Sequence, residues 1–283
     1  MLLKDFLPPK DLIEFVRCYR IVHFSFDKHM PTPTKAYPPR PEHCLAFYPR
    51  DTEKVEYAKS GKQMNHFRTS LTGQQTELLN RQVGNDFMIL QIVFQPTGLY
   101  RITGIPSNEF TDQYLDGASV FPNVDLINEQ LYHAKTYHEM LDISNSFVRE
   151  LIKKSNIRDS HSIDVISKLL LQQTDRCSLT KLADQACLCT KQFERKFMER
   201  TGVMPKIFSR IARFDRAFRM KNRNRSLDWM TIAVQCGYYD YQHLVKDYQR
   251  FTSYTPTLLH AIEDKAPERA LGLSEAWYRH SID

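Results

Sequence analysis

The sequence predicts an α+β protein whose β-rich amino-terminal half is followed by an all-α carboxy-terminal half. Three observations lead to this prediction. Up to residue 122, apolar runs rich in aromatic and β-branched residues are separated by Pro, Gly, Asn and Asp, which is typical of short strands and loops. Beyond that point the apolar residues recur with a helical period near 3.6. One helical pattern also occurs twice, because 182–205 and the segment that ends at Pro256 share their apolar, small and proline positions.

The amino-terminal domain, residues 1–122, is predicted to be a barrel or a sandwich. The runs at 20–26, 43–49 and 87–95 have the alternating or continuously apolar pattern of strands. Many short strands with loop-rich connections favour either of these two architectures. A short helix is expected at 98–104, because Pro and Gly bound a segment with one apolar face.

The rest of the chain divides into three segments. Residues 123–158 are predicted to form a helical connector, since their apolar residues have helical spacing. The polar stretch 155–162 marks the junction to an all-helical domain, 159–262, with two helix-turn-helix units. The tail, 263–283, contains helical pieces, and its pattern leaves open whether it packs on the first domain or frays.

Positive charge is concentrated in the helical domain. The whole chain has a net charge of +6, whereas residues 159–262 hold 17 Lys or Arg against 10 Asp or Glu, a difference of +7 that leaves −1 for all other residues. A basic domain joined to a near-neutral one suggests a module that binds a polyanion, although an ordinary solvated surface has the same signature.

The composition also argues against several classes of protein. No run approaches the roughly 18 apolar residues of a membrane span, and the first residues lack the features of a signal peptide. We therefore expect a cytosolic protein without a membrane partner. The six cysteines form no C-x-x-C pair, which indicates neither a disulfide framework nor a zinc ribbon. We interpret the C-x-C pair of Cys187 and Cys189 as core packing rather than as a thiol sensor.

The first copy of the repeated pattern indicates a helix, a tight turn and a second helix. Its first helix opens with a Ser N-cap, "CLC" interrupts it, and Phe193 and Phe197 face inward from the second helix. Ala183 supplies a small side chain where the two helices cross. In the second copy Ala233 has the same place, and Gly237 lies in the turn, where a positive φ costs a glycine little.

Outward-facing residues of the two second helices predict contacts with base edges. In a major groove Arg and Lys donate to guanine, Gln pairs with adenine, and Val meets the thymine methyl group. This mixture suits base reading better than uniform charge would. The residues expected to read bases are Lys191, Glu194 and Arg195 in the first unit and Tyr241, Gln242, Val245 and Lys246 in the second.

A helix over 206–225 is expected to join the two units as a rigid spacer, with a rise of ~1.5 Å per residue. Its apolar stripe faces the core and its arginines line the remainder. Two reading helices held about 34 Å apart on one face would meet successive turns of the major groove. The residues expected to contact the DNA backbone are Lys206, Arg210 and Arg250.

The stretch from about 178 to 259 resembles the tandem helix-turn-helix domain of the AraC/XylS transcription regulators. The second unit of that family typically reads "IA…GF…hF…FK…G.SP", and the first unit here retains "F…F…TGVMP". The resemblance implies a transcription regulator that binds double-stranded DNA, with RNA polymerase as a further partner. The matching turn and structural residues are Ala183, Gly202, Pro205, Ala233, Gly237 and Pro256.

Three residues depart from the family's pattern. Ser253 stands where the family usually has Gly, Cys189 takes a position often held by a capping Ser or Thr, and Leu244 replaces a Phe. We therefore expect the turn at Ser253 to be strained or differently shaped, and the pose of the second reading helix to be affected.

The segment 92–106, "IVFQPTGLYRITGIP", is similar to a motif of the sensor domains on a branch of these regulators. In the larger family such domains are often cupin-like β-barrels, so the resemblance implies that this domain binds a small-molecule effector or forms a homodimer. Gln95 to Gly98 is a candidate rim of an effector pocket or an interface, and the alternative, which we favour, is an ordinary turn from strand to helix.

Catalysis and metal binding are not expected. Single histidines, without an H-x-H pair and a carboxylate, do not match a metal-dependent cupin, so we expect no enzymatic activity, no metal and no cofactor. These histidines are His23, His29, His43 and His66. The alternative interpretation is a small-molecule-binding or enzymatic cupin-like protein whose basic helical domain binds another macromolecule, RNA or protein. A preference for B-DNA sites over single strands or RNA would separate the two interpretations.

Overall fold

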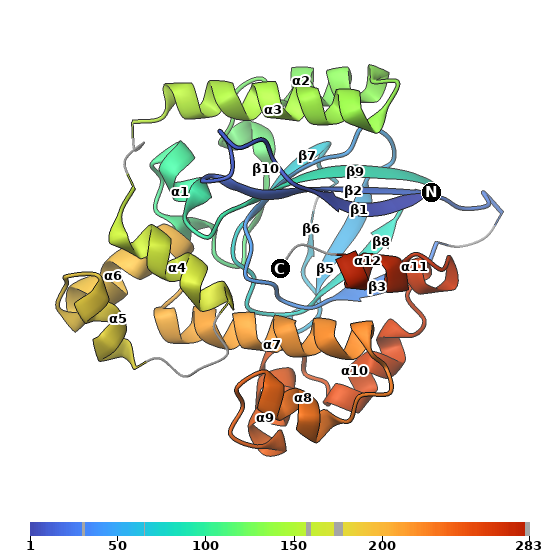
Figure 1. Ribbon diagram of the computed structural model, residues 1–283. Helices are drawn as coiled ribbons and strands as arrows, with labels where there is room; N and C mark the ends of the chain where they lie inside the picture. The colour runs from blue at the N-terminus through green and yellow to red at the C-terminus, as the bar shows by residue number, and fades with distance from the viewer. Residues whose placement is uncertain (30–31, 65, 157–159, 173–177, 281–283) are drawn as a thin grey trace.

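The computed structural model describes residues 1–29, 32–64, 66–156, 160–172 and 178–280. It confirms the predicted α+β class, with a β-rich domain between a pair of long helices on one side and the carboxy-terminal helical domain on the other (Figure 1). Among the described residues, no helix is long and apolar enough to cross a membrane.

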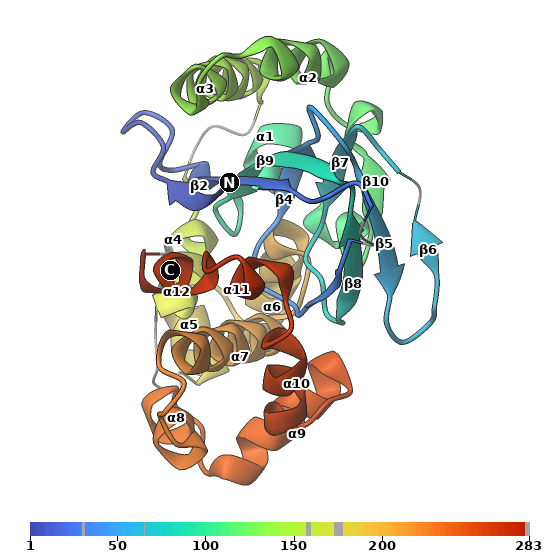
Figure 2. The same cartoon turned by 90° about the vertical axis from the view of Figure 1, so that its right-hand side faces the viewer.

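The β-rich domain contains two antiparallel sheets, which favours the sandwich over the single closed barrel within the described residues (Figure 2). Across the six-stranded sheet the strands are β1 (Leu2–Phe6), β2 (Val16–Ser25), β9 (Asp86–Phe94), β4 (Cys44–Phe47), β7 (Thr69–Thr72) and β10 (Tyr114–Asp116). Across the four-stranded sheet they are β3 (Thr34–Tyr37), β8 (Leu79–Val83), β5 (Glu53–Tyr57) and β6 (Gln63–Met64). The three predicted strand runs coincide with β2, β4 and β9.

The central strand β9 is apolar nearly throughout because both of its faces are covered. Leu90 and Ile92 lie in the main core, beneath α2 (Val124–His133) and α3 (Tyr137–Lys154). Phe87 and Ile89, on the opposite face, belong to a second cluster on the side of the four-stranded sheet. A strand buried on both faces loses the alternation of a half-exposed one, which explains why "FMILQIVF" is apolar except at Gln91.

The helical connector forms as predicted, as the hairpin of α2 and α3 over the outer face of the six-stranded sheet (Figure 1). Phe147 of α3 packs edge-on against Phe47 of β4, with ring centroids 5.8 Å apart. The predicted short helix is also present, as α1 (Gly98–Thr103), followed by the 3-10 turns η1 (Ser107–Phe110) and η2 (Gly117–Ser119).

The carboxy-terminal domain packs its helices around two cores, one for each helix-turn-helix unit. Its helices are α4 (Ser162–Gln172), α5 (Leu179–Gln185), α6 (Thr190–Thr201), α7 (Pro205–Arg223), α8 (Trp229–Gln235), α9 (Tyr241–Thr252) and α10 (Pro256–Glu263). The Ser178 hydroxyl caps α5 by accepting from the backbone N–H of Lys181, as the sequence predicts. Cys189 stands at the N-cap of α6 without a side-chain cap hydrogen bond. The predicted core packing of Cys187 and Cys189 is wrong, because both lie exposed at the turn between α5 and α6.

The tail, which the sequence left as either packed on the first domain or frayed, is packed on that domain. After α10 the chain turns back through α11 (Pro267–Ala270) and α12 (Ser274–His280), and α12 lies against both β1 and α7 (Figures 1 and 2). Trp277 and Tyr278 are buried there. The indole Nε1 of Trp277 donates to the carboxylate of Asp5, 3.3 Å away, so the last helix of the chain is tied to its first strand.

The first helix-turn-helix unit is docked on the β-rich domain at another place, where α6 meets α1 and η1. The Thr111 hydroxyl donates to the carbonyl of Gly202 (2.6 Å), and the Tyr100 hydroxyl donates to Glu199 (2.9 Å). Each helix-turn-helix unit therefore has its own attachment to the amino-terminal domain.

Candidate nucleic-acid interface and interdomain cavity

The two helix-turn-helix units have the same turn, made by the same backbone hydrogen bonds. In the first unit the N–H of Leu188 donates to the carbonyl of Ala183 (3.0 Å), and in the second the N–H of Tyr238 donates to that of Ala233 (2.9 Å). Both alanines are buried at the helix crossing. The predicted repeat is thus a structural repeat.

The turn needs a left-handed residue at one position, which is Gly237 in the second unit, with φ of +75°. Cys187 takes the equivalent place in the first unit with φ of +54°, a conformation that costs a non-glycine residue. The helix ends repeat the pattern, since Gly202 after α6 has φ of +88° and Ser253 after α9 has φ of +64°. Ser253 therefore has the strained backbone that the departure from the family's pattern predicts.

Replacing Gly237 by Val is expected to destabilise the second unit by about 1–3 kcal/mol, because a β-branched residue is strained at positive φ. Urea unfolding of the full chain measures the change. Ser253→Gly is the matched opposite, expected to be neutral or stabilising by up to about 1 kcal/mol. A Gly237→Val protein with the wild-type midpoint would mean that the turn tolerates a side chain.

The structure places the predicted base-reading residues on the first two turns of α6 and α9. Lys191 and Arg195 are exposed on α6, and Gln242 and Lys246 are exposed on α9. The others are half-buried, and Tyr241 packs against the core of the second unit. Gln192 and His243 are also exposed on these turns, although they were not among the predicted residues. Gln192 directly follows Lys191, and His243 directly follows Gln242. This adjacency to predicted base-reading residues could have identified them from the sequence.

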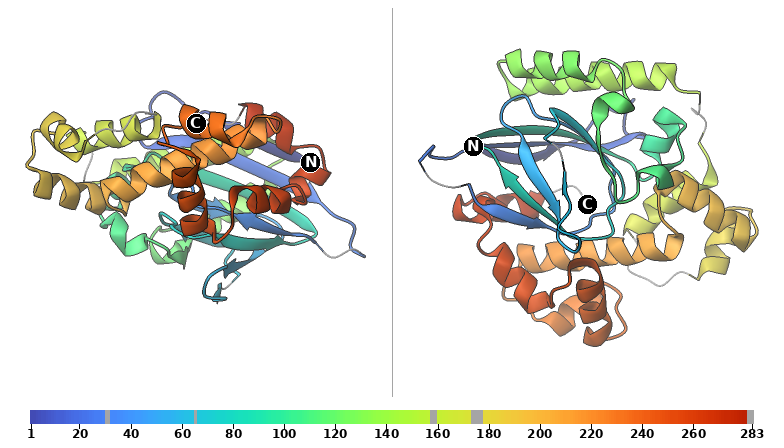
Figure 3. Two further views of the ribbon diagram at one scale, coloured as in Figure 1. Left: turned by 90° about the horizontal axis from the view of Figure 1, so that it is seen from below. Right: turned by 180° about the vertical axis from the view of Figure 1, so that it is seen from behind.

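The helix α7 joins the two units, as predicted, and contributes to both cores (Figure 3). It has 19 residues, which at ~1.5 Å per residue gives a rod about 28 Å long. Phe208 packs against Phe197 of the first unit, and Phe214 against Tyr248 of the second, with ring centroids 5.5 and 4.8 Å apart. These contacts fix both α6 and α9 to one rigid element.

Of the three residues predicted to contact the DNA backbone, Arg210 has an internal partner. Its Nε lies 2.9 Å from Oδ1 of Asp247 on α9, and Arg213 approaches the other oxygen of that carboxylate at 3.6 Å. Arg210 thus helps hold α9 on α7. Lys206 and Arg250 are exposed. The backbone contacts of all three residues remain predictions.

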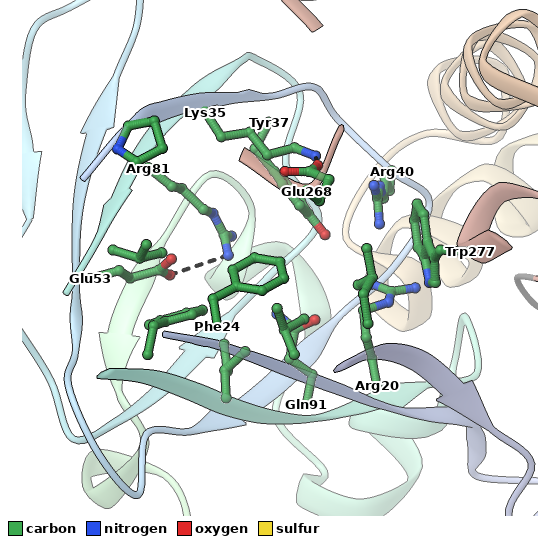
Figure 4. Close-up of a pocket in the computed structure, with 16 residues that line it drawn as sticks. Arg20, Phe24, Lys35, Tyr37, Arg40, Glu53, Arg81, Gln91, Glu268 and Trp277 are labelled. Atoms are coloured by element: carbon green, nitrogen blue, oxygen red, sulfur yellow. Dashed lines mark hydrogen bonds and ion pairs between the residues drawn. The ribbon is translucent and has the colours of Figure 1, made fainter. Parts of the chain in front are cut away.

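A cavity lies between the β-rich domain and the tail, with a volume of about 90 Å³ (Figure 4). One part of its wall is apolar and the rest carries charged and polar groups. Two of the lining residues come from the tail. The apolar residues are Leu3, Val22, Phe24, Pro33, Val83, Phe87 and Ile89, and the others are Arg20, Lys35, Tyr37, Arg40, Glu53, Arg81, Gln91, Glu268 and Trp277.

Most charges in this cavity are paired within the protein. Arg20 binds Asp5 (2.9 Å) and Glu42 (3.1 Å). Arg81 pairs with Glu53 at 3.2 Å.

Lys35 joins the cavity to the tail, pairing with Glu268 and, at 3.4 Å, with Glu263 at the end of α10. Burial lowers the pKa of Lys35 to about 8, against the opposing attraction of Glu263.

Sequence patterns did not find this cavity, because its residues come from separate strands and from the far end of the chain. The rim predicted at Gln95 to Gly98 is not part of its lining. Gln95 instead donates to the carbonyl of Ile13 (2.9 Å), and a Cβ at Gly98 would lie 2.2 Å from the carbonyl oxygen of Phe15. This segment is therefore an ordinary turn from strand to helix, which was the alternative to a pocket rim.

The geometry also bears on metal binding. Among the described residues, no group of three or more His, Cys, Asp or Glu side chains is placed to hold a metal ion. Both ring nitrogens of His43 are buried without a hydrogen-bond partner, and burial lowers its pKa to about 4. That histidine is therefore neutral near pH 7.

Comparison with solved structures identifies the fold. A structure of ToxT from Vibrio cholerae aligns with 86% of this chain and 97% of its own, with a TM-score of 0.50 and 10% sequence identity. The fold is that of ToxT. The two-domain architecture implied by the AraC/XylS resemblance is thereby confirmed.

Other comparisons cover parts of the chain. The DNA-binding domain of the global transcriptional factor AdpA, solved with a target DNA, matches 37% of this chain and 95% of its own, with 20% identity and a TM-score of 0.35. The xylose-binding transcription activator XylR matches 44% of this chain and 39% of its own, with 12% identity and a TM-score of 0.29. A family model described as a domain of unknown function (DUF6597) matches residues 4–116. None of the curated proteins matches the chain.

Proposed function

We propose that the protein is a sequence-specific transcription regulator that binds double-stranded DNA and responds to a small-molecule effector. One observation carries the proposal: the same helix-turn-helix unit occurs twice, with identical turn hydrogen bonds, on one rigid helix. The ToxT-like fold is consistent with it.

In the proposed complex α6 and α9 enter successive segments of the major groove. Lys191 and Arg195 present donors suited to guanine O6 and N7, and Gln242 presents an amide suited to adenine. Glu194, Tyr241, Val245 and Lys246 complete the set of base-reading residues. Lys206 and Arg250 are exposed cations that we assign to phosphates. Because α7 is packed into both cores, the spacing of the two reading helices is fixed before DNA binds.

The amino-terminal domain is proposed to control this binding. It touches the first unit through α1 and η1 and the second through the tail. Because Glu268 and Trp277 of the tail line the cavity, a change there can act on the position of the second unit. A homodimer, contact with RNA polymerase and a cytosolic location remain predictions that follow from this role. The alternative, an effector-binding or enzymatic protein whose basic domain binds RNA or protein, predicts no preference for duplex DNA.

The proposal is tested by selecting binding sites from a random duplex library with the full chain. We expect one preferred site with two half-sites, and an affinity for it that falls steeply with salt because several phosphates are neutralised. Single strands and RNA of the same sequence serve as competitors. Equal binding to RNA and duplex, or no enriched site, would favour the alternative.

A further inference from the structure

Two exposed cysteines stand at the turn of the first helix-turn-helix unit, separated by a single residue. Cys187 is the left-handed residue of that turn, and Cys189 is the N-cap of α6. The other cysteines that the structure describes, Cys18, Cys44 and Cys236, are buried. The pair therefore differs from them in being open to solvent, and it lies directly before the helix that carries the first set of proposed base-reading residues.

Local stability does not explain a cysteine at either position. The second unit has Gly237 and Asp240 at the corresponding places. Glycine adopts a positive φ at little cost, and the Asp240 carboxylate caps α9 by accepting from the backbone N–H of His243, 2.8 Å away. Cys187 instead has φ of +54°, and the Cys189 side chain makes no cap hydrogen bond. The repeat thus shows which residues the turn prefers, and the first unit departs from them twice with the same residue type.

Access to solvent also separates the pair chemically from the buried cysteines. Oxidation of a thiol requires that an oxidant reach the sulfur and that the thiol ionise. Burial raises the pKa of the Cys18 and Cys236 thiols to about 11, and it raises the pKa of Cys44 as well. Those three thiols are protonated near pH 7 and shielded by the core. Among the described cysteines, an oxidant in solution therefore meets Cys187 and Cys189 first.

We propose that Cys187 and Cys189 are a redox site, at which a hydroperoxide forms a reversible disulfide that weakens DNA reading by α6. One thiol attacks the hydroperoxide: an S–O bond forms, the O–O bond breaks, and an alcohol or water leaves with the thiol proton. The second thiol attacks the resulting sulfenic acid, so that the S–S bond forms, the S–O bond breaks and water leaves with the second proton. Two molecules of a thiol such as glutathione reduce the disulfide again by exchange and are themselves joined.

The disulfide acts on the turn that positions α6. It closes a small ring around Leu188, whose N–H makes the turn hydrogen bond to the carbonyl of Ala183. Because disulfide geometry is specific, the bond imposes its own constraint on the backbone between α5 and α6. The β-rich domain holds the far end of α6 through Glu199 and Gly202, so a change at the turn acts on the end that carries Lys191. This inference rests on the proposed function, since it names a regulation of the same DNA-reading helix.

Peptide mapping tests the disulfide independently of DNA. Trypsin cleaves after Lys181 and Lys191, so both cysteines of the pair fall on the peptide 182–191. Cys177, which lies outside the described residues, falls on a different peptide. The full-length protein is treated with hydrogen peroxide or cumene hydroperoxide, blocked with iodoacetamide and digested. We expect the peptide 182–191 to be two hydrogen atoms lighter than its dithiol form and to carry no alkyl group, whereas prior reduction with dithiothreitol lets it take two.

DNA binding of the same samples measures the effect of the disulfide. Oxidation should weaken binding to the site selected from the duplex library by about tenfold or more, and dithiothreitol should restore it. The double variant Cys187→Gly, Cys189→Ser has residues that the turn and the N-cap favour, so it should bind like the reduced wild type and keep its affinity after peroxide. If the double variant does not fold, Cys189→Ser alone serves, since it cannot close the disulfide. Cys177→Ser is the matched control and should lose affinity on oxidation as the wild type does.

Three results would overturn the inference. These are a peptide 182–191 without the disulfide after either peroxide, a disulfide that leaves the affinity for DNA unchanged, and a double variant that loses affinity on oxidation as the wild type does. A reduced protein that binds its DNA site but forms no disulfide loses only this inference. A protein that forms the disulfide but binds no duplex DNA when reduced loses the proposed function, and the regulation of DNA reading with it.

Discussion

Replacing Asp247 by Ala is expected to destabilise the helical domain by about 2–4 kcal/mol. The carboxylate is 5% exposed and pairs with Arg210 and Arg213 of α7, so its removal leaves two partly buried arginines without their anion. The arginine side chains are 24% and 21% exposed, which lets water offset part of the loss. Urea unfolding of the full chain measures the effect.

The same substitution should also weaken DNA recognition at one of the two half-sites only. Asp247 holds α9 on α7, whereas α6 has its own contacts with Phe208 and with the β-rich domain. We therefore expect the half-site read by α9 to lose its base preference before the other does. Asp240→Ala is the control on the same helix, because this exposed N-cap should cost only about 1 kcal/mol. Equal effects of the two substitutions would contradict the role given to the Asp247 pairs.

Replacing Arg195 by Ala is expected to relax the base preference at one position of the site. Arg195 is exposed on α6, whose apolar side is fixed by the buried Phe193 and Phe197. A bidentate contact of its guanidinium with guanine is worth about 1–3 kcal/mol of discrimination. Binding to a randomised-site library at two salt concentrations measures the change, and non-specific affinity should remain nearly unchanged.

Lys206→Ala is the matched control for Arg195→Ala. It should weaken binding to all sequences alike and reduce the salt slope by about one unit, as expected for a phosphate contact. Arg210→Ala is a poorer control, because it would also break the pair with Asp247. Base preferences that remain unchanged at every position in Arg195→Ala would show that α6 does not read the groove.

The helix-turn-helix units could be predicted because their determinants are local in sequence. A small residue at the crossing, a left-handed turn residue and inward aromatic residues recur within short windows, and the structure bears this out at Ala183, Ala233 and Gly237. The strands of the first domain were found for the same reason, since apolar periodicity reports which faces are covered. The exposed positions of Lys191 and Arg195 also follow from helical spacing once Phe193 is placed inside.

The role of Arg210 could not be predicted from local sequence patterns. Helical spacing placed it on the outer side of α7, where a phosphate contact was the natural expectation. Only the packing of α9 across α7 brings Asp247 to its guanidinium, 37 positions along the chain. A charged side chain has the same sequence pattern whether it faces water or a buried partner on another helix.

What the sequence by itself determined is the class of fold, the two repeated units and the exposed face of the second helix in each, because these depend on the periodicity of neighbouring residues. The tertiary structure alone decided the place of the tail and the cavity that it closes. Asp5 and Trp277, which meet there, are separated by 272 positions. Such a contact depends on how two domains pack, and no local pattern of apolar or charged residues records it.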